Sequence, residues 1–476
     1  MSESESRLYK TLLLAFLLLA LLVFFWGLGS IGLMSFNEAR RALPAQAMFL
    51  GGDWLLPHLN GELYLTKPPL LYWLAAIAAH IAGATSEWAV RLPSALAAAA
   101  TLAMVYMYAR RQFGAWPALF SAQILIANVT FAMFARRAEI EMLLTALCVA
   151  SLLAAIHYIR EGANRRWIYL SYFLLGLAVL TKGPLALLFV TLPLLLVAIY
   201  QRDARCWQVL GSPLGWLIFV AVGLSWYIAV SWRMGPEIWS AIVHKDMLGK
   251  IQDEATAKPL LSYLLWLLVD FLPVVLLFFI RPKTIWEKLK GRTDTLILLA
   301  AILVPLVIFS LISNKHAKYL LPIYPLLALL LGMHLGRFFE LAGLRTKRLI
   351  LAVGVLLPLL YAGYYAIAEA RIYDYRVSAF PQFSNWSGLP QAAPLYAYKD
   401  ADERLFYYSA RHIAVIDEAA YRQLRDSHAA MLLLADSKNL PTVRPQAGCV
   451  IKEFKPYLKK DETLTVLGFG AACASQ

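Results

Sequence analysis

Long apolar runs recur along this chain, and they constrain its fold more than any other feature. A helix crosses the ~30 Å hydrocarbon layer of a membrane in about 20 apolar residues, and the runs have roughly that length. The sequence is 60% hydrophobic and 16% charged, which is too little charge to cover a soluble protein of 476 residues. It therefore predicts an α-helical polytopic membrane protein.

About eleven spans are expected. They cover residues 11–33, 92–109, 114–135, 140–158, 167–181, 184–200, 212–231, 260–280, 294–313, 319–336 and 348–368. The first run is long for a signal peptide and lacks a convincing small-residue cleavage site, so a retained anchor is expected. The formal net charge of +14 requires no nucleic-acid partner, because much of it lies in short loops beside anionic membrane lipid.

The segment 68–83 decides the orientation of every later span. It begins with two prolines and is short for a crossing. If it lies along the membrane interface, the strongly basic connectors all fall on the cytoplasmic side, as the positive-inside rule requires. If it crosses, most of these connectors lie outside. We therefore expect an interfacial segment, an inner N-terminus and an outer C-terminus, with the first outer loop at 34–91.

Residues 1–369 are expected to form the transmembrane domain, and the character of the chain changes after them. From about residue 370 the sequence alternates strand-like and helix-like stretches, such as PLYAYK, HIAVI and DEAAYRQLRD. This alternation predicts a small α/β domain over 370–476, outside the membrane. Cys449 and Cys473 lie in it and could oxidise to a disulfide there, but the sequence does not show whether they meet.

The first outer loop, SFNEARRALPAQAMFLGGDWLLPHLNGELYLTKPPLLYWL, holds the densest group of candidate functional residues. Ser35 and Glu38 have the spacing of a capping box and predict a short helix that starts at Ser35. The N-terminus of this helix, with Asn37, Arg40 and Arg41, suits an anion. Glu38 is either an acid of this site or only the cap of the helix.

A second carboxylate, Glu141, lies in the motif ARRAEIEMLLTALC at the outer end of a hydrophobic helix. A charged group at that depth costs about 3 kcal/mol unless it is paired or hydrated, which favours a functional role. The alternative is a plain ion pair along the helix between Arg137 and Glu141. Glu139 is expected to point to a different, solvated face.

Four lysines and a tyrosine are expected at the same outer surface: Lys67, Lys182, Lys315, Lys318 and Tyr319. Lysines commonly extend to headgroup level, so Lys67 alone is a weak signal. Lys182 lies in the turn of VLTKGPLALL, where it either serves the site or merely ends a helix. The basic motif SNKHAKYLLPIYP runs against the positive-inside tendency, which favours a bound anion.

Metal and nucleotide chemistry have little support in the sequence. His58, His80, His244 and His316 are assigned to the outer side, but no HxH, HExxH or CxxC spacing is present. No P-loop or GxSxG motif is present either. No cofactor is therefore expected, with a divalent metal as the minor alternative. Asp270 is the only acid deep inside an apolar run, and its partner stays open.

The run NEARRALPAQAMFLGGDWLLPHLNGELYLTKPPLLYWL resembles the first outer loop of bacterial polyprenyl-phosphate-sugar-dependent glycosyltransferases of the GT-C class. That class includes the lipid A aminoarabinose transferases and relatives of the protein O-mannosyltransferases. The resemblance continues, in order, through EMLLT, LAVLTKGPLALL, LSWYIAV and SNKHAKYLLPIYPLLALLLG. It covers most of the membrane part, whereas the C-terminal domain matches no family pattern.

The resemblance implies an outer-facing cavity and a sugar donor linked to a lipid phosphate. Lys67 matches the lysine that the family assigns to that phosphate, and Glu141 matches the second outer-loop carboxylate, usually Asp. His244 fits a family histidine, but Met247 stands where the family has a phosphate-binding Arg. Asn37 replaces the acid that usually opens the loop motif. Either Glu38 or Glu141 then carries the acid role, or the acceptor is already nucleophilic, such as a phosphate, or the enzyme is weak or divergent.

The resemblance predicts an inverting glycosyltransferase of the bacterial inner membrane, with its active site and C-terminal domain on the periplasmic side. It would move a sugar from a polyprenyl-phosphate carrier to a lipid A, glycan or protein acceptor. We expect the donor phosphate to be held by Lys67, Arg40, Lys315 and Lys318. Glu38 or Glu141 would orient or deprotonate the acceptor. Further substrate contacts are expected from Asn37, Arg41, Arg137, Lys182, His244 and Tyr319.

Two alternatives from other classes remain at this point. A transporter or flippase of lipid-linked sugars would use the same basic cavity without chemistry, but it favours charges near the bilayer midplane and internally repeated halves. The charges here concentrate at one surface and no repeat is evident, with Asp270 as the exception. The other alternative is an accessory protein whose outer domain binds a partner. The replacement of the usual family acid by Asn37 favours this alternative.

Overall fold

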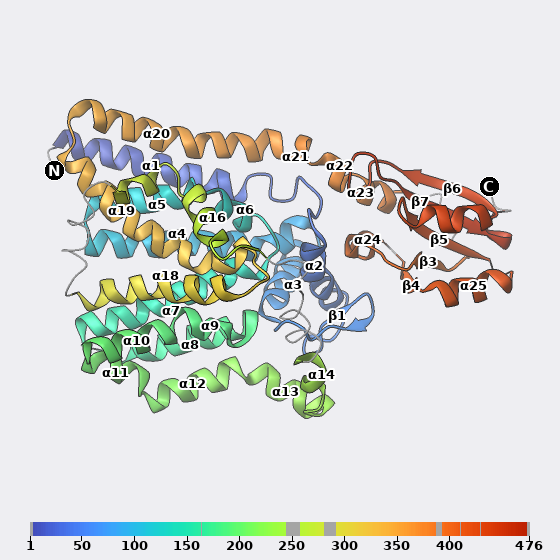
Figure 1. Cartoon of the computed structure of the whole chain (residues 1–476), viewed down its shortest axis with the longest axis horizontal. Helices are drawn as coiled ribbons and strands as arrows, with labels where there is room; N and C mark the ends of the chain where they lie inside the picture. The colour runs from blue at the N-terminus through green and yellow to red at the C-terminus, as the bar shows by residue number, and fades with distance from the viewer. Residues whose placement is uncertain are drawn as a thin grey trace.

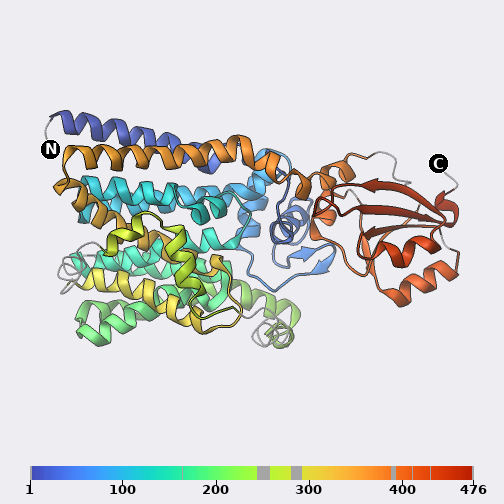
Figure 2. The ribbon, with the colours of Figure 1, turned by 45° about the horizontal axis from the view of Figure 1, so that its top comes forward.

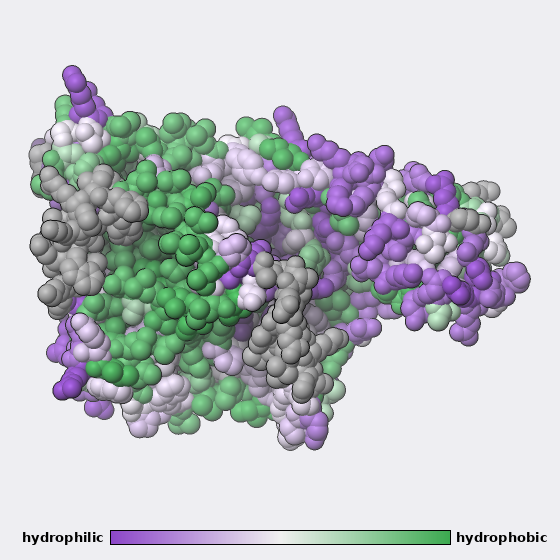
Figure 3. Space-filling model, viewed as in Figure 1, coloured by the Kyte–Doolittle hydropathy of each residue, from purple (hydrophilic) through white to green (hydrophobic). Residues whose placement is uncertain are grey.

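The N-terminus and the C-terminal domain lie at opposite ends of a long helical bundle (Figure 1 and Figure 2). The computed structural model describes residues 3–162, 164–243, 258–279, 292–386, 393–409, 411–428 and 430–473. Figure 3 shows a broad apolar surface over the bundle and a mostly hydrophilic one over the C-terminal domain. A broad apolar surface is unfavourable in water and favourable against lipid, so this division fits a membrane-embedded bundle.

Eight helical stretches of the described residues are long and apolar enough to cross a membrane. The count is nine if α5 (Ala115–Ile126) and α6 (Val129–Ala135), which meet at 68°, form one span. The eight are α1 (Glu3–Phe25), α4 (Glu87–Gln112), α7 (Ile140–Glu161), the stretch Arg166–Gln201, α11–α12 (Ala204–Gly223), α18 (Thr293–Leu311), η5–α19 (Ala317–Leu341) and α20–α21 (Leu344–Ile372). Two features explain why the sequence predicts about eleven spans instead of eight or nine.

The stretch Arg166–Gln201 is a helical hairpin rather than one helix. It contains α8 (Arg166–Lys182), η1 (Gly183–Leu185), α9 (Ala186–Phe189) and α10 (Thr191–Gln201). The end of α8 meets the start of α7, because Lys182 Nζ lies 3.0 Å from Glu141 Oε1. The end of α10 meets the start of α18 at the far end of α7, where Thr293 Oγ1 donates to Gln201 Oε1 at 2.7 Å. The chain therefore reverses at Gly183, whose φ is +77°, and makes the two predicted passes.

The predicted span 260–280 is broken. Its described part consists of α16 (Ser262–Asp270) and η4 (Val274–Phe279), which are too short to count as a span. Asp270 lies at this break and at the break between α5 and α6. Its Oδ2 accepts hydrogen bonds of 2.6 Å from Thr130 and from Tyr324, at the start of α19 (Tyr324–Leu341). These contacts give the partly buried acid polar partners, so a transport role is not needed to explain it.

The first outer loop carries four short elements at the same end of the bundle as the C-terminal domain (Figure 1). They are α2 (Phe36–Phe49), β1 (His58–Leu59), β2 (Glu62–Leu63) and α3 (Leu70–Ala82). Ser35 caps α2 as predicted, since its side chain accepts from the Glu38 backbone N–H. At 13 residues, α3 is too short to cross the bilayer. Both ends of the loop meet, because Glu38 pairs with Arg91 at 2.9 Å.

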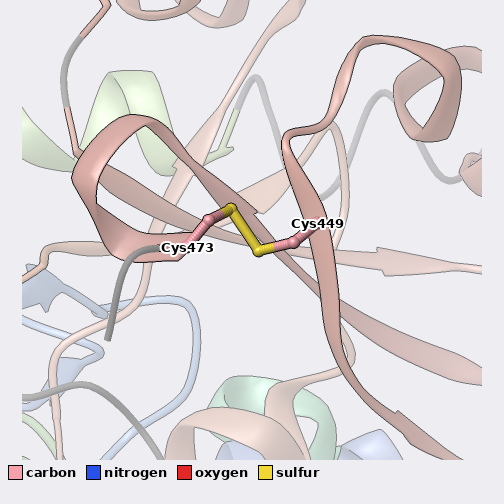
Figure 4. The surroundings of a disulfide bond; sticks show 2 residues. All are labelled: Cys449 and Cys473. Carbon is pink, nitrogen blue, oxygen red and sulfur yellow. A yellow bond between two sulfur atoms is a disulfide. The ribbon is translucent and has the colours of Figure 1, made fainter. Parts of the chain in front are cut away.

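The C-terminal region is the predicted α/β unit. Its five-stranded sheet has the order β4-β3-β5-β7-β6, with β3 (Leu395–Tyr398), β4 (Ala414–Ile416) and β5 (Met431–Asp436) parallel. The strand β7 (Leu464–Phe469) pairs antiparallel with β5, and β6 (Cys449–Phe454) pairs antiparallel with β7 at the edge of the sheet. The helices are α22 (Asp374–Val377), α23 (Ala379–Ser384), α24 (Glu403–Tyr408), α25 (Glu418–Asp426) and α26 (Leu440–Val443). Cys449 and Cys473 meet and form a disulfide (Figure 4).

Helix α24 attaches this unit to the first outer loop. The Tyr408 hydroxyl accepts from the Leu33 backbone N–H at 2.9 Å and donates to Glu87 at 2.5 Å. Arg40 of α2 donates to Glu403 at 2.7 Å. The remaining helices, α13 (Ser225–Met234) and α14 (Ile238–Val243), lie beyond α12 (Pro213–Gly223) at the same end of the bundle (Figure 1).

Cysteine labelling tests the placement of α3. Single cysteines at Glu62 and Ala84, both exposed and on either side of α3, should react equally with a membrane-impermeant maleimide on intact spheroplasts. A cysteine at Arg165, at the other end of the bundle, should react only after permeabilisation. The native background is low, because Cys148 and Cys206 are buried and the other two cysteines are bonded. Labelling of positions 62 and 84 from opposite sides would show that α3 crosses.

Candidate active site

Two acids and two lysines form a buried network where the apolar bundle ends. Glu141, in the first turn of α7, accepts from Lys182 at 3.0 Å, and Lys318 of η5 (Ala317–Ile323) lies 3.8 Å from the same oxygen. Lys318 also pairs with Glu139 at 3.1 Å. Lys182 Nζ lies 4.7 Å from the centre of the Tyr319 ring. The structure thus brings together Glu141, Lys182, Lys318 and Tyr319, as the sequence predicts.

The position of Glu141 at a helix start stabilises its charge. Its side chain is 2% exposed, so the carboxylate loses most of its hydration. The positive end of the α7 dipole and the two lysine ammonium groups offset that loss. Among the described residues, Glu141 Oε2 is buried without a hydrogen-bond partner. Such an acceptor is costly to leave unsatisfied, which suits a contact with a hydroxyl or ammonium group of a ligand.

Arg41 contacts the hydroxyl end of Tyr64, on the same loop as Lys67. Arg41 Nη1 donates to the hydroxyls of Tyr64 and Tyr72, at 3.1 and 3.2 Å. Burial alone would raise the pKa of Tyr64, but Arg41, a hydrogen bond with Thr66 and the nearby Lys67 ammonium lower it. Arg41 Nε is buried without a partner among the described residues. Arg41 lies on the first outer loop beside the network on α7, because its charge acts on both Glu139 and Glu141.

Glu139 is a site residue that the sequence reasoning placed wrongly. The prediction of a solvated side chain is wrong, because Glu139 is 6% exposed and bonded to Lys318. Burial and the neighbouring Glu141 raise its pKa, although Lys318 and Arg41 oppose them. The error comes from the backbone: Glu139 is the N-cap of α7 and has extended φ and ψ, so helical spacing does not govern its direction. The sequence did contain a signal that could have identified Glu139, because two acids, Glu139 and Glu141, lie at the start of an apolar helix.

Glu38 lies in a separate, fully buried cluster. Its Oε1 accepts from Arg91 Nε and from the Ala138 backbone N–H, each at 2.9 Å. Its Oε2 accepts from the Met34 backbone N–H at 2.7 Å. Burial alone would raise the pKa of Glu38, but Arg91 and Arg137 together with these hydrogen bonds lower it to about 2. Glu38 therefore stays charged and links α2, α4 and the start of α7.

The other predicted binding residues have partners of their own. Arg137 pairs with Glu369 at 2.5 Å and lies 3.9 Å from Glu38. Lys315 is 2% exposed, and its ammonium donates to the carbonyls of Ile312 at 2.6 Å and Lys258 at 3.1 Å.

Arg40 is held by Glu403 of the C-terminal domain, so the structure does not add it to the Lys182 network. Asn37 is partly exposed in the first turn of α2. His244 lies outside the residues that the structure describes. Within the described ranges, no three His, Cys, Asp or Glu side chains form a group that could hold a metal ion.

Two family models match parts of the chain. The Dolichyl-phosphate-mannose-protein mannosyltransferase model matches residues 66–232, and the Alg9-like mannosyltransferase family model matches residues 256–386.

The relatives that match most of this chain share one function name. The "Undecaprenyl phosphate-alpha-4-amino-4-deoxy-L-arabinose arabinosyl transferase" of Pseudomonas aeruginosa strain PAO1 is 30% identical over 445 residues, which cover 84% of this chain and 79% of that relative. Its counterpart in strain UCBPP-PA14 is 29% identical and covers 90% of this chain and 83% of its own length.

Solved structures show the same fold. ArnT from Cupriavidus metallidurans, bound to undecaprenyl phosphate, superimposes with a TM-score of 0.76 at 19% identity. The match covers 95% of this chain and 97% of that one. The oligosaccharyltransferase of Archaeoglobus fulgidus matches with a TM-score of 0.56 at 12% identity and covers 94% of this chain.

Replacement of Glu38 by Gln tests its structural role. The change leaves the Arg91 charge buried without its counter-charge, so the free energy of unfolding should fall by about 3–5 kcal/mol in mixed detergent micelles. In the wild type, Glu38 makes its full contribution to the free energy of unfolding at neutral pH. It is lost as the pH falls from the ordinary 4.5 toward about 2, because the folded state depresses the pKa.

The exposed pair Arg7–Glu3 offers a matched control, with side chains 80% and 83% exposed. Glu3→Gln removes the same kind of charge. Because water screens this pair, the free energy of unfolding should barely change. Equal effects of the two substitutions would contradict the assigned role of Glu38.

Proposed function

Since this chain belongs to the family of bacterial undecaprenyl phosphate-α-4-amino-4-deoxy-L-arabinose arabinosyl transferases, we propose that it transfers this aminosugar to lipid A. The chain is a GT-C glycosyltransferase that takes a sugar from a polyprenyl-phosphate carrier and is embedded in the membrane through its helical bundle. The proposal adds the identity of the sugar, undecaprenyl phosphate as the carrier, lipid A rather than a glycan or protein as the acceptor, and a periplasmic active site.

The observation that carries the proposal is the group of cations around two buried carboxylates where the bundle ends. Lys182 and Lys318 contact Glu141, and Lys318 also pairs with Glu139. The charge of Arg41 acts on both carboxylates as well. A phosphate monoester, which is what the carrier becomes when it loses its sugar, is an anion at neutral pH. A cluster of cations therefore suits this leaving group.

In the proposed reaction, an oxygen of the acceptor attacks the anomeric carbon of the sugar. The bond from that carbon to the acceptor oxygen forms as the bond to the carrier phosphate breaks, and the electron pair leaves with the phosphate. Lys67 and Arg41 stabilise the charge that grows on the leaving group, an effect that often contributes most to such catalysis. A phosphate oxygen of lipid A is already ionised, so attack needs no general base. The reaction therefore does not need an acid at position 37, where this chain has Asn37.

Glu141 and Glu38 receive different roles in this proposal. Glu141 holds the Lys182 ammonium in place and offers its buried, unpaired Oε2 to a polar group of the sugar. Glu38 acts as a positioning residue, because both its oxygens are occupied by Arg91 and backbone N–H groups. The sequence-based proposal of Glu38 as a catalytic acid is replaced accordingly.

Two variants of the site and one control variant test the proposal. Lys67→Ala should lower kcat/KM for the undecaprenyl-linked sugar by about 10²–10³-fold, the usual effect of losing one group that stabilises a growing negative charge. Glu141→Gln should lower it as well, because Lys182 loses its charged partner. Lys438→Ala removes an exposed lysine of the C-terminal domain and should leave the rate unchanged. The measurement is transfer of labelled aminosugar to lipid A by the purified enzyme in liposomes.

The same assay can refute the proposal. Wild-type rates in both Lys67→Ala and Glu141→Gln would remove these residues from the site. Mass spectrometry of lipid A from a deletion strain tests the sugar and the acceptor independently: the strain should lack the aminosugar on lipid A. An unchanged lipid A, with a sugar missing from a glycan or glycoprotein instead, would contradict the proposed acceptor.

A further inference from the structure

The two residues that η5 contributes to the candidate active site, Lys318 and Tyr319, lie on an unusual element. η5 is a 3-10 helix of seven residues, Ala317–Ile323, and contains Pro322. The hydrogen bonds of a 3-10 helix have poorer geometry than those of an α-helix, and long runs of it are uncommon. Pro322 also has no backbone N–H to donate. The position of Lys318 and Tyr319 therefore depends on the contacts of η5 with other segments.

Helix α16 supplies such contacts at both ends of η5. The hydroxyl of Tyr263, in the first turn of α16, accepts from the backbone N–H of His316 and donates to its carbonyl, each at 3.2 Å. His316 is the N-cap of η5. At the other end of α16, Asp270 accepts at 2.6 Å from the hydroxyl of Tyr324, the residue that follows η5. Helix α16 is thus hydrogen-bonded to the residue before η5 and to the residue after it.

The segments that precede α16 and η5 are paired as well. The Lys258 ammonium donates to the Lys315 carbonyl at 2.8 Å, and the Lys315 ammonium donates to the Lys258 carbonyl at 3.1 Å. The Lys258 backbone N–H donates to the Ser313 carbonyl at 3.1 Å. The stretch from Lys258 to Asp270 therefore supports η5 along its length.

Asp270 joins this support to a third segment, α6. The same oxygen that accepts from Tyr324, Oδ2, also accepts from Thr130 Oγ1 at 2.6 Å. The backbone carbonyl of Asp270 accepts from Asn128 Nδ2 at 3.0 Å. Asn128 is the N-cap of α6, because its Oδ1 accepts from the Phe131 N–H at 2.8 Å. Two polar side chains at the start of α6 thus hold the end of α16.

The two segments that meet at Asp270 lead to the two partners of one ion pair in the site. From Thr130, the chain runs through α6 to Glu139. From Tyr324, it runs back through η5 to Lys318. Glu139 and Lys318 pair at 3.1 Å. The contacts therefore form a closed circuit, in which one oxygen of Asp270 fixes the distance between the segments that carry the pair.

We propose that Asp270 is a positioning residue for the transfer reaction, because its carboxylate holds Lys318 in place against Glu139. The inference rests on the proposed function, in which a cluster of cations stabilises the leaving phosphate. An ionisable side chain within an apolar run is costly, which favours a role that an apolar residue cannot fill. The hydroxyls of Thr130 and Tyr324 require only an acceptor oxygen. The role of Asp270 therefore lies in its hydrogen bonds and involves no transfer of a proton.

Substitutions of Asp270 test this role by kinetics. Asp270→Leu has a similar volume but no acceptor, and kcat should fall by about 10²-fold, the effect of a displacement of about 1 Å in a site. KM for the undecaprenyl-linked sugar should stay unchanged, because the lost interaction acts in the transition state. Asp270→Asn keeps an oxygen that accepts two hydrogen bonds, so kcat should stay within about threefold of the wild-type value.

Tyr106→Phe is the matched control. It removes a hydrogen bond of 2.8 Å between the hydroxyls of Tyr106 on α4 and Tyr9 on α1, which also joins two helices but holds no residue of the site. Neither kcat nor KM should change. A loss of kcat in Asp270→Asn as large as that in Asp270→Leu overturns the inference.

A double substitution tests whether the effect of Asp270 acts through Lys318. In a Lys318→Ala enzyme, Asp270→Leu should lower kcat by no more than about twofold further, because both changes remove the same interaction. General damage to the fold would instead multiply the two losses. Multiplied losses overturn the inference.

A spectroscopic measurement tests the placement of η5 without any activity. Fluorotyrosine in place of Tyr319 reports on the surroundings of η5, since the Lys182 ammonium lies 4.7 Å from the centre of this ring. The fluorine resonance should shift or broaden in Asp270→Leu and keep its position in Asp270→Asn and Tyr106→Phe. An unchanged resonance in Asp270→Leu overturns the inference. A wild-type enzyme that transfers no aminosugar to lipid A refutes the proposed function instead, and the resonance still decides the role of Asp270.

Discussion

The buried Glu38–Arg91 ion pair fixes three segments of this molecule relative to one another. A charge in a low-dielectric interior must be neutralised and hydrogen-bonded, and Glu38 meets that demand with groups from three segments. Its oxygens accept from Arg91 on α4, from Met34 before α2 and from Ala138 just before α7. Arg41 lies one turn from Glu38 along α2, and Glu141 lies three residues beyond Ala138. A single carboxylate thus fixes the two groups of the candidate active site relative to each other.

The C-terminal domain contributes to the same arrangement from outside the membrane. Tyr408 and Arg404 of α24 bond to the backbone of Leu33, next to the Met34 N–H that Glu38 uses. The domain therefore restrains the loop on which the ion pair depends, although it adds no residue to the network of Glu141 and Lys182. The match to the arabinosyl transferase of strain UCBPP-PA14 covers 90% of this chain and so extends into this domain. Its contacts make it part of the scaffold of the site.

Features that follow from local sequence could be predicted, and features that depend on distant partners could not. Apolar length predicted the spans, and the Lys182–Gly183 turn predicted the hairpin. The segment after Lys67 was predicted not to cross, and α3 is too short to cross. Arg40 and Arg41 show the limit: adjacent helical residues differ by about 100° in direction, and only the fold decides which one meets Tyr64 and which one meets Glu403. The direction of Glu139 depended on a helix boundary, and boundaries are the least certain part of a sequence-based assignment.

The level of the Glu141–Lys182 pair, where the apolar helices give way to polar loops, has a kinetic consequence. Both substrates of such a site are lipids that arrive by lateral diffusion in one leaflet, in two dimensions. The quantity that sets the encounter rate is then the mole fraction of each lipid in the membrane, rather than its concentration in the bulk volume. Inert lipid slows turnover by surface dilution even when the total amounts of enzyme and substrate stay constant, so velocities from different vesicle preparations compare only at equal surface density.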